Sequence, residues 1–301
     1  MSDALPPFVD THVHMWDLDR FEYPWLAHPD FEVLRHDYLP NQWLADAGEL
    51  ALTGAVHVQA EVDHAVDPVE ETAWLSSLDL GSGAPPLACV AYADLRSPQL
   101  EQLLERHAGA GPVSGIRQEA WFDPRSDRAD IPRFNLLDDP TWRQGLARLA
   151  RRELSFDLLV WPHQLEQAAE IFAALPELPV VLEHTGLPPL GDPEGMEVWR
   201  RGMRTFSDAV PGSMLKVSAM AFISGGWTVA AVAPVVREAI ETFGPQRCMF
   251  GSNFPVDRTA ATYEQIWAGY AAMVADFSAA EREALFRANA LRTYRLLPIN
   301  N

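Results

Sequence analysis

Short apolar runs recur along the chain, and most of them are followed by an amphipathic segment of helical length. The runs are rich in aliphatic and β-branched residues, which is typical of strands buried on both faces. Eight runs are found: the first spans 7–14, and the others end at Glu61, Leu95, Ala120, Trp161, Gly186, Ala219 and Pro255. Strands that alternate with helices pair in parallel through right-handed crossovers.

Eight such units predict an α/β fold, a single-domain (β/α)8 TIM barrel spanning residues 1–301. A doubly wound open sheet is the alternative, but no glycine-rich phosphate turn follows the first run. Helix starts with proline directly after a capping residue support the alternation, at Asp67-Pro68, Ser97-Pro98 and Asp139-Pro140.

Two connections are long, at residues 15–50 and 121–138, and loops of that length in a compact domain are usually binding loops or lids. The last predicted helix starts with a capping box formed by Ser278 and Glu281. We expect this helix to complete the outer layer of the barrel.

Composition and charge narrow the class of protein. No apolar run approaches the roughly 18 residues of a membrane span, and the first residues lack a secretory signal, so a cytoplasmic protein with no membrane partner is expected. The formal net charge of −19 would repel phosphate backbones, which excludes nucleic acid as a partner. Cys89 and Cys248 are too few for a structural cysteine–zinc site.

The first run, FVDTHVH, places His12 and His14 one residue apart, where side chains of a strand point to the same face. Alone, this pair also fits the polar face of a half-exposed strand. In a barrel, however, the carboxyl ends of all strands meet at one face. The polar residues expected there are His12, His14, Gln59, Glu61, Asp94, Arg117, Glu119, Asp157, Glu183, His184, Lys216, Ser218, Ser252 and Asn253.

Several motifs, in this order and spacing, resemble the amidohydrolase superfamily, specifically the branch that includes sugar-lactone and pyrone-dicarboxylate lactonases. The resemblance covers the whole chain and rests on DTHVHMWDL, YPWL, VHVQAE, GIRQ, LEHTGLP, LKVSA, RCMFGSNFPVD and RANALRTYRL. It implies a hydrolase that opens a small lactone derived from a sugar acid or an aromatic catabolite. The substrate would be a small molecule, either anionic or a lactone.

The resemblance also implies roles for particular residues. His12, His14 and His184 match histidines that bind one divalent metal ion and take part in catalysis, and Arg117 matches an arginine that holds substrate oxygen. Three imidazoles and an open position suit zinc. Some lactonases of this branch work without a metal, so both options stay open.

Asn253 stands where relatives carry an aspartate that acts as general base. An amide cannot accept a proton at neutral pH, but it can orient a water molecule or donate a hydrogen bond to an oxyanion. The base could instead be a water activated by the metal, one of the three histidines, or Asp257 if its loop folds back.

Three further residues are candidates for substrate binding: Glu61, Lys216 and Trp161. Lys216 could equally form a structural ion pair with Glu183 or Glu61, Glu61 could support the histidines, and the tryptophan could serve mainly to pack its loop. Two other functions stay open, a decarboxylase of aromatic acids and a barrel that binds a ligand without catalysis. Whether the chain forms a homo-oligomer is also left open.

Overall fold

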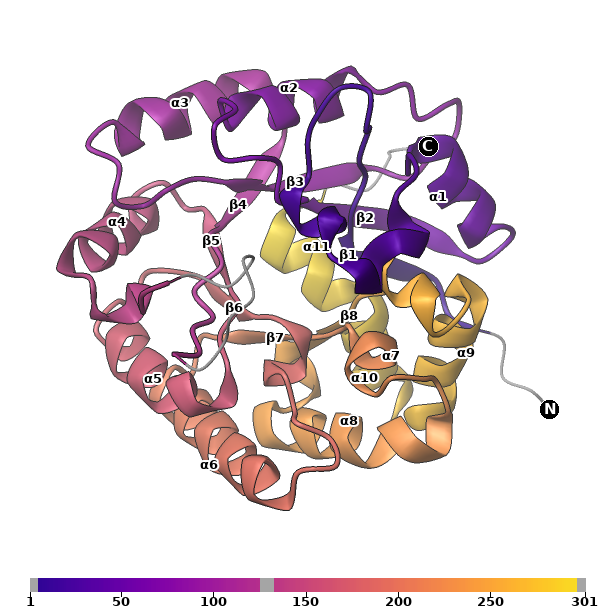
Figure 1. Ribbon diagram of the computed structural model, residues 1–301. Coiled ribbons are helices and arrows are strands. Elements are labelled where there is room, and N and C mark those ends of the chain that lie inside the picture. Colours follow the sequence, from indigo (N-terminus) through magenta and orange to yellow (C-terminus); the bar gives the residue numbers. More distant parts are fainter. Residues whose placement is uncertain (1–4, 125–132, 297–301) are drawn as a thin grey trace.

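The computed structural model describes residues 5–124 and 133–296. Eight parallel strands follow one another around a single sheet in the order of the sequence (Figure 1). They are β1 (Phe8–Val13), β2 (Leu52–Val58), β3 (Leu87–Tyr92), β4 (Val113–Arg117), β5 (Ser155–Leu158), β6 (Val180–Leu182), β7 (Met214–Val217) and β8 (Cys248–Phe250). The predicted TIM barrel is therefore confirmed.

The barrel closes where the chain beyond β8 returns to β1. The backbone N–H of His14 donates to the carbonyl of Phe254, and that of Asn253 donates to the carbonyl of His12, both at 2.8 Å. The Asp10 carboxylate accepts the backbone N–H of Ser252 at 2.9 Å and its hydroxyl at 2.6 Å. These bonds fix the carboxyl end of β1 against the segment that carries Asn253.

The helices are α1 (Pro40–Ala47), α2 (Val69–Ser77), α3 (Leu100–Ala110), α4 (Pro140–Ala150), α5 (Leu165–Ala173), α6 (Pro193–Ala209), α7 (Met220–Ile223), α8 (Val229–Phe243), α9 (Tyr263–Met273), α10 (Ala279–Glu283) and α11 (Asn289–Tyr294). Most of them surround the sheet and cover its outer face, whereas α11 lies inside this ring (Figure 1). Asp139 caps α4 by accepting the N–H groups of Thr141 and Trp142, and the capping box at Ser278 starts α10. Both starts follow from local sequence signals.

The end of the chain differs from the expectation. The segment after Ser278 comprises α10, a π-helical turn at Ala284–Ala288, and α11, rather than one regular helix. Ala290, Tyr294 and Leu296 pack with side chains of the barrel interior, such as Val9. The expectation that this helix belongs wholly to the outer layer is wrong, because its apolar end fills the mouth of the barrel opposite the strands' carboxyl ends.

The first long connection contains two 3-10 turns, at Pro24–Ala27 and Pro29–Leu34, followed by α1. Trp16 is buried, and its indole N–H donates to the carbonyl of His36 at 2.6 Å. Within the second connection, residues 125–132 lie outside the described residues. Packing of tryptophan thus holds the first connection onto the barrel.

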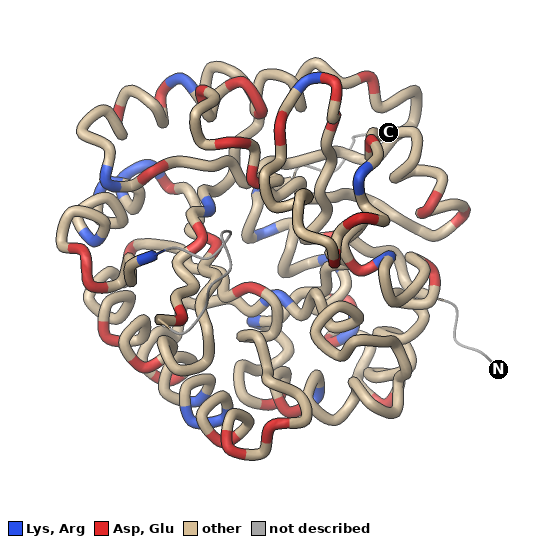
Figure 2. Tube along the Cα trace, in the orientation of Figure 1, with Lys and Arg blue, Asp and Glu red and all other residues tan. Residues whose placement is uncertain are grey.

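The outside of the fold is mainly acidic. Acidic positions outnumber basic ones along the surrounding helices (Figure 2), in keeping with the net charge of −19.

Across residues 5–124 and 133–296, every helix falls short of the length and apolar character needed to cross a membrane.

Replacing Tyr294 by phenylalanine should destabilise the fold, since its hydroxyl donates to the fully buried Asp157 carboxylate at 2.7 Å. Hydrogen bonds to charged groups contribute about 1.5–3 kcal/mol, and urea unfolding of Tyr294→Phe should show a loss of that size. Tyr92→Phe is the matched control, because its hydroxyl contacts the side chains of the exposed His64, at 3.4 Å, and of Gln118, rather than a fully buried carboxylate. Equal stability of the two variants would contradict this role of Tyr294.

Candidate active site

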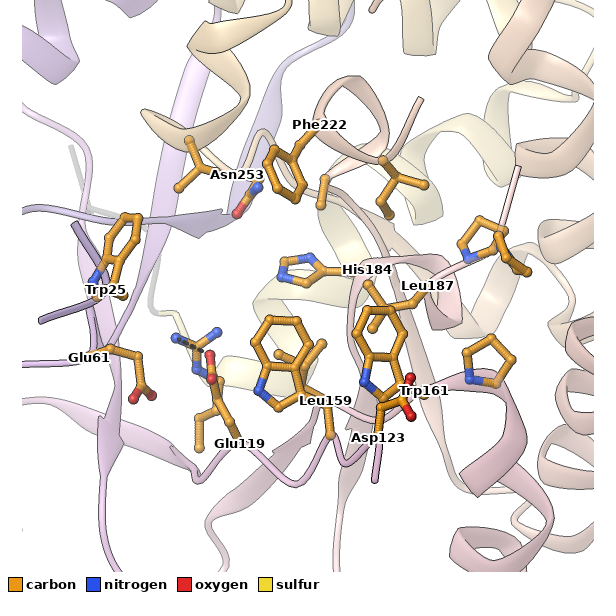
Figure 3. A pocket seen from close by; sticks show the side chains of 18 of the residues that line it. Trp25, Glu61, Glu119, Asp123, Leu159, Trp161, His184, Leu187, Phe222 and Asn253 are labelled. Atoms are coloured by element: carbon orange, nitrogen blue, oxygen red, sulfur yellow. Dashed lines mark ion pairs between the residues drawn. The ribbon is translucent and has the colours of Figure 1, made fainter. Parts of the chain in front are cut away.

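A cavity of about 1070 Å³ lies at the carboxyl ends of the strands (Figure 3). His14, Arg117, His184 and Asn253 all line it. Glu61 and Trp161 line it as well. Residues from both ends of the chain and from its middle therefore meet in one place.

The three histidines converge at the floor of this cavity. The Nε2 atoms of His12 and His14 are 3.1 Å apart, and the ring centres of His12 and His184 are 4.5 Å apart. His12 is fully buried beneath the cavity, whereas His14 and His184 reach its surface. His12 thus contacts both of the other rings.

Hydrogen bonds orient the outer two rings. His14 donates from Nδ1 to the carbonyl of Val58 at 2.8 Å, which leaves its Nε2 lone pair facing His12. Nδ1 of His184 is hydrogen-bonded to the hydroxyl of Ser218 at 2.9 Å. Burial lowers the pKa of His12 and of His14 well below the usual value, and it lowers the pKa of His184 to about 4. All three rings are neutral at physiological pH.

Glu183 lies directly beside the histidines, although the sequence analysis did not include it among the metal ligands. Its Oε1 is 3.2 Å from Nδ1 of His12. Burial alone would raise the pKa of this carboxyl, but the positive charges of Arg117 and Lys216 outweigh that effect and hold its pKa well below the usual value. Glu183 is therefore ionised, although it is inaccessible to solvent.

These groups suit a divalent metal ion. One ligand atom each from His12, Glu183 and His184 can be chosen so that all three lie within 4.8 Å of one another. Nδ1 of His12 lies 3.2 Å from Glu183 Oε1 without forming a hydrogen bond to a described residue, and its Nε2 faces another ring nitrogen. A pair of neutral imidazole nitrogens and a carboxylate is a common donor set for zinc.

Arg117 and Lys216 both form ion pairs with Glu183. Arg117 donates from one terminal nitrogen to Glu183 Oε2 at 3.3 Å and from the other to the carbonyl of Gln59 at 2.7 Å. Lys216 donates to Asp157 at 2.6 Å and to Glu183 Oε1 at 3.5 Å. Arg117 still reaches the cavity, but Lys216 is fully buried and does not line it.

The expected role of Lys216 in substrate binding is therefore corrected. Its ammonium group forms ion pairs inside the barrel, where an unpaired charge would be costly. The geometry therefore supports the alternative, a structural ion pair. The partner is Glu183 together with Asp157; Glu61 instead accepts from Gln59 and contacts His64 at 3.2 Å.

Asn253 is held by a second residue, Asp257, four positions later. Nδ2 of Asn253 donates to Asp257 Oδ1 at 2.8 Å, and the backbone N–H of Ala221 donates to Oδ2 at 2.9 Å. Figure 3 shows the amide oxygen of Asn253 pointing into the cavity. Burial raises the pKa of Asp257 to about 7, against these two donors, which favour its ionised form. Asp257 thus sets which way the amide faces.

Comparison with known proteins supports one family. The sequence profile of the amidohydrolase family matches residues 9–296. The chain belongs to the amidohydrolase family. It is a hydrolase of this family. The strands bring together His12, Glu183 and His184, whose side chains could bind a metal ion.

Three relatives are similar to this amidohydrolase over nearly its whole length. An uncharacterized Sinorhizobium fredii protein, y4mH, is 37% identical over 98% of this chain and 100% of its own. An L-fucono-1,5-lactonase of Burkholderia multivorans is 32% identical over 96% of both chains. The crystal structure of an amidohydrolase from the same species with bound zinc covers 97% of this chain and 100% of its own, with 30% identity and a TM-score of 0.81.

Glu183→Gln tests how much the stability of this amidohydrolase depends on the buried carboxylate beneath its cavity. Arg117 and Lys216 would keep their buried charges without this partner, and breaking a buried ion pair costs about 3–5 kcal/mol. Urea unfolding at neutral pH measures that loss. The matched control is Glu166→Gln, which breaks the half-exposed pair with Arg201 and should cost no more than about 1 kcal/mol.

The pH dependence gives a second measurement of the same interaction. Since the folded-state pKa of Glu183 lies well below the usual 4.5, its contribution to stability is present above that value. The contribution is lost as the pH falls through the folded-state pKa. The Glu183→Gln variant should not show this part of the stability loss at acid pH. If the stability of the variant fell with pH as that of the wild type does, the ionised state inferred for Glu183 would be contradicted.

Proposed function

We propose that this amidohydrolase opens the ring of a small uncharged lactone by adding water to its carbonyl carbon. The observation that carries the proposal is the convergence of three neutral histidines with Glu183 at the floor of the cavity. The similarity to an L-fucono-1,5-lactonase supports a lactone as substrate, and the size of the cavity suits a small molecule.

An uncharged substrate fits the charge of the walls better than an anionic one. Five carboxylates line the cavity in the part of the chain that the structure describes: Glu61, Asp63, Glu119, Asp123 and Asp192. Arg117 is the single arginine among the described lining residues, and its charge is already opposed by Glu183. Carboxylates accept hydrogen bonds from hydroxyl groups, so the walls favour a hydroxylated ring.

Zinc is the metal we propose for the floor, held by His12, His184 and Glu183, with His14 against His12. This set differs from the three histidines expected from the sequence, because Glu183 takes the place of His14. The zinc-bound amidohydrolase from Burkholderia multivorans supports the choice of metal. When bound, a divalent ion of this kind polarises a carbonyl oxygen and lowers the pKa of water.

The residues of the chain would hold the reactants in place. Arg117 presents a buried guanidinium at the cavity and would bind a lactone oxygen. Asn253, with its Nδ2 engaged by Asp257, presents Oδ1 to the cavity and would accept a hydrogen bond from the attacking water. An amide cannot take the proton of that water, whereas the neutral imidazole of His14, which lines the cavity and is not among the proposed ligands, can.

Hydrolysis of L-fucono-1,5-lactone and of δ-valerolactone, followed as acid release at constant pH, tests the proposal. The protein as purified without chelators should open at least one of them. His184→Asn should lower kcat/KM by about 10²-fold, because an amide is a poor ligand and a poor base in place of imidazole. Metal content measured on both proteins should fall in the variant.

Chelation and re-addition of zinc provide the control for the metal. Loss of rate with a chelator and recovery with zinc would support the metal, and an unchanged rate would contradict it while leaving lactone opening intact. Release of carbon dioxide from a hydroxybenzoate would favour the decarboxylase alternative. Absence of both reactions would favour the ligand-binding barrel.

Asp257→Asn distinguishes the two roles left open for Asn253. The new amide must offer its oxygen to the backbone N–H of Ala221, so its NH₂ group would face Asn253 and turn that amide around. If Asn253 accepts a hydrogen bond from water, kcat should fall by about tenfold or more; if it donates to an oxyanion, kcat should be retained. The double variant with Asn253→Ala should be no slower than Asn253→Ala alone.

A further inference from the structure

The cavity extends well beyond the space that a single lactone ring needs. Its volume of 1070 Å³ exceeds the upper end of the ~300–1,000 Å³ range of pockets that bind drug-sized ligands. A monosaccharide lactone has only about a dozen non-hydrogen atoms, far fewer than a drug-sized ligand. Much of the cavity would stay filled with water unless the substrate is larger.

The two ends of the cavity differ in chemistry (Figure 3). Glu61, Glu119 and Asn253 lie toward one end, and His184 lies between the two ends. Leu187 and Trp161 lie toward the other, where the loops that follow β5 and β6 form the wall. Pro188, Pro189 and Leu190 continue this wall along the chain from Leu187. Beyond the reacting ring, the cavity therefore offers the apolar surfaces of Trp161 and the Leu187–Leu190 segment, together with the carboxylates of Asp123 and Asp192.

We propose that this apolar end is a second subsite, which binds a flat hydrophobic substituent of the lactone, such as a phenyl group, against Trp161. The proposal rests on the proposed function, because it names the class of lactone that the same site accepts: an uncharged lactone that carries an aryl group. Aromatic rings bury a large apolar area and stack favourably on tryptophan.

The surface around Trp161 is formed before any ligand binds. Its ring stacks on Trp121, with centres 5.3 Å apart and planes inclined by 24°. Gln164, which is buried, accepts the backbone N–H groups of Trp161 and Phe122 at 3.0 Å and donates to the carbonyl of Ala120 at 2.9 Å. This side chain locks together the loops after β4 and β5, so little conformational entropy would be lost on binding.

Charge at this end selects against an anionic substituent. Asp123 and Asp192 both line the cavity, and Figure 3 shows Asp123 toward the same end as Trp161. The described residues contribute neither lysine nor arginine to this part of the wall. A carboxylate on the aryl group would meet the like charge of Asp192.

Kinetics on matched substrates test the subsite. The ratio of kcat/KM for δ-phenyl-δ-valerolactone to that for δ-valerolactone should be about tenfold or more in the wild type. A 4-carboxyphenyl substituent should abolish this preference. Trp161→Ala should bring the phenyl ratio to near unity. Trp25→Ala removes a tryptophan from the opposite end of the cavity and should leave the ratio at its wild-type value.

Calorimetric titration with the unreactive lactams 6-phenylpiperidin-2-one and piperidin-2-one separates this proposal from the proposed function. Tighter binding of the phenyl lactam, by about tenfold in the wild type and not in Trp161→Ala, would support the subsite even if no lactone were hydrolysed. Equal affinity for the two lactams, or an equal loss of the phenyl preference in Trp25→Ala, would overturn it while leaving lactone opening untouched.

Discussion

One buried carboxylate, Glu183 at the end of β6, connects the interior of the barrel to its cavity. It accepts hydrogen bonds from Arg117 of β4 and Lys216 of β7 and contacts His12 of β1. Burying these ions is costly unless each is paired, so none of them can be removed without leaving another charge unsatisfied. The position of His12 beneath the cavity therefore depends on residues from three other strands.

The backbone at the rim is also held in an unusual conformation. Glu61, His184, Ala219 and Asn253, which follow β2, β6, β7 and β8, all have positive φ between 52° and 59°. Residues other than glycine adopt this left-handed conformation at an energetic cost, and they keep it only where the surrounding structure enforces it. Here the ladder of parallel strands and the bonds from β1 to the segment after β8 enforce it, which fixes the side chains that point into the cavity.

Sequence patterns predicted the strands and several helix starts because these depend on neighbouring residues. The alternation of apolar runs with capped helices needs no long-range information, and the His12–His14 pair follows from strand geometry. Three features could not be predicted in this way, because they depend on contacts between residues distant in the sequence. They are the place of Tyr294 inside the barrel, the pairing of Lys216 with Asp157, and the position of Glu183 among the candidate ligands. Asp257 could be named but not placed, since the turn after Asn253 decides whether its carboxylate faces the cavity or the amide.

The arrangement of charges at the floor suits the proposed reaction on an uncharged lactone. Below the cavity, Arg117 and Lys216 are matched by Glu183 and Asp157, so these four groups together carry no net charge. The three histidines are neutral, because burial lowers their pKa values. A divalent ion between His12, His184 and Glu183 would therefore add positive charge at the floor, while the walls carry carboxylates. Attraction for negative charge would then be concentrated where a carbonyl oxygen becomes an oxyanion, and not spread over the cavity.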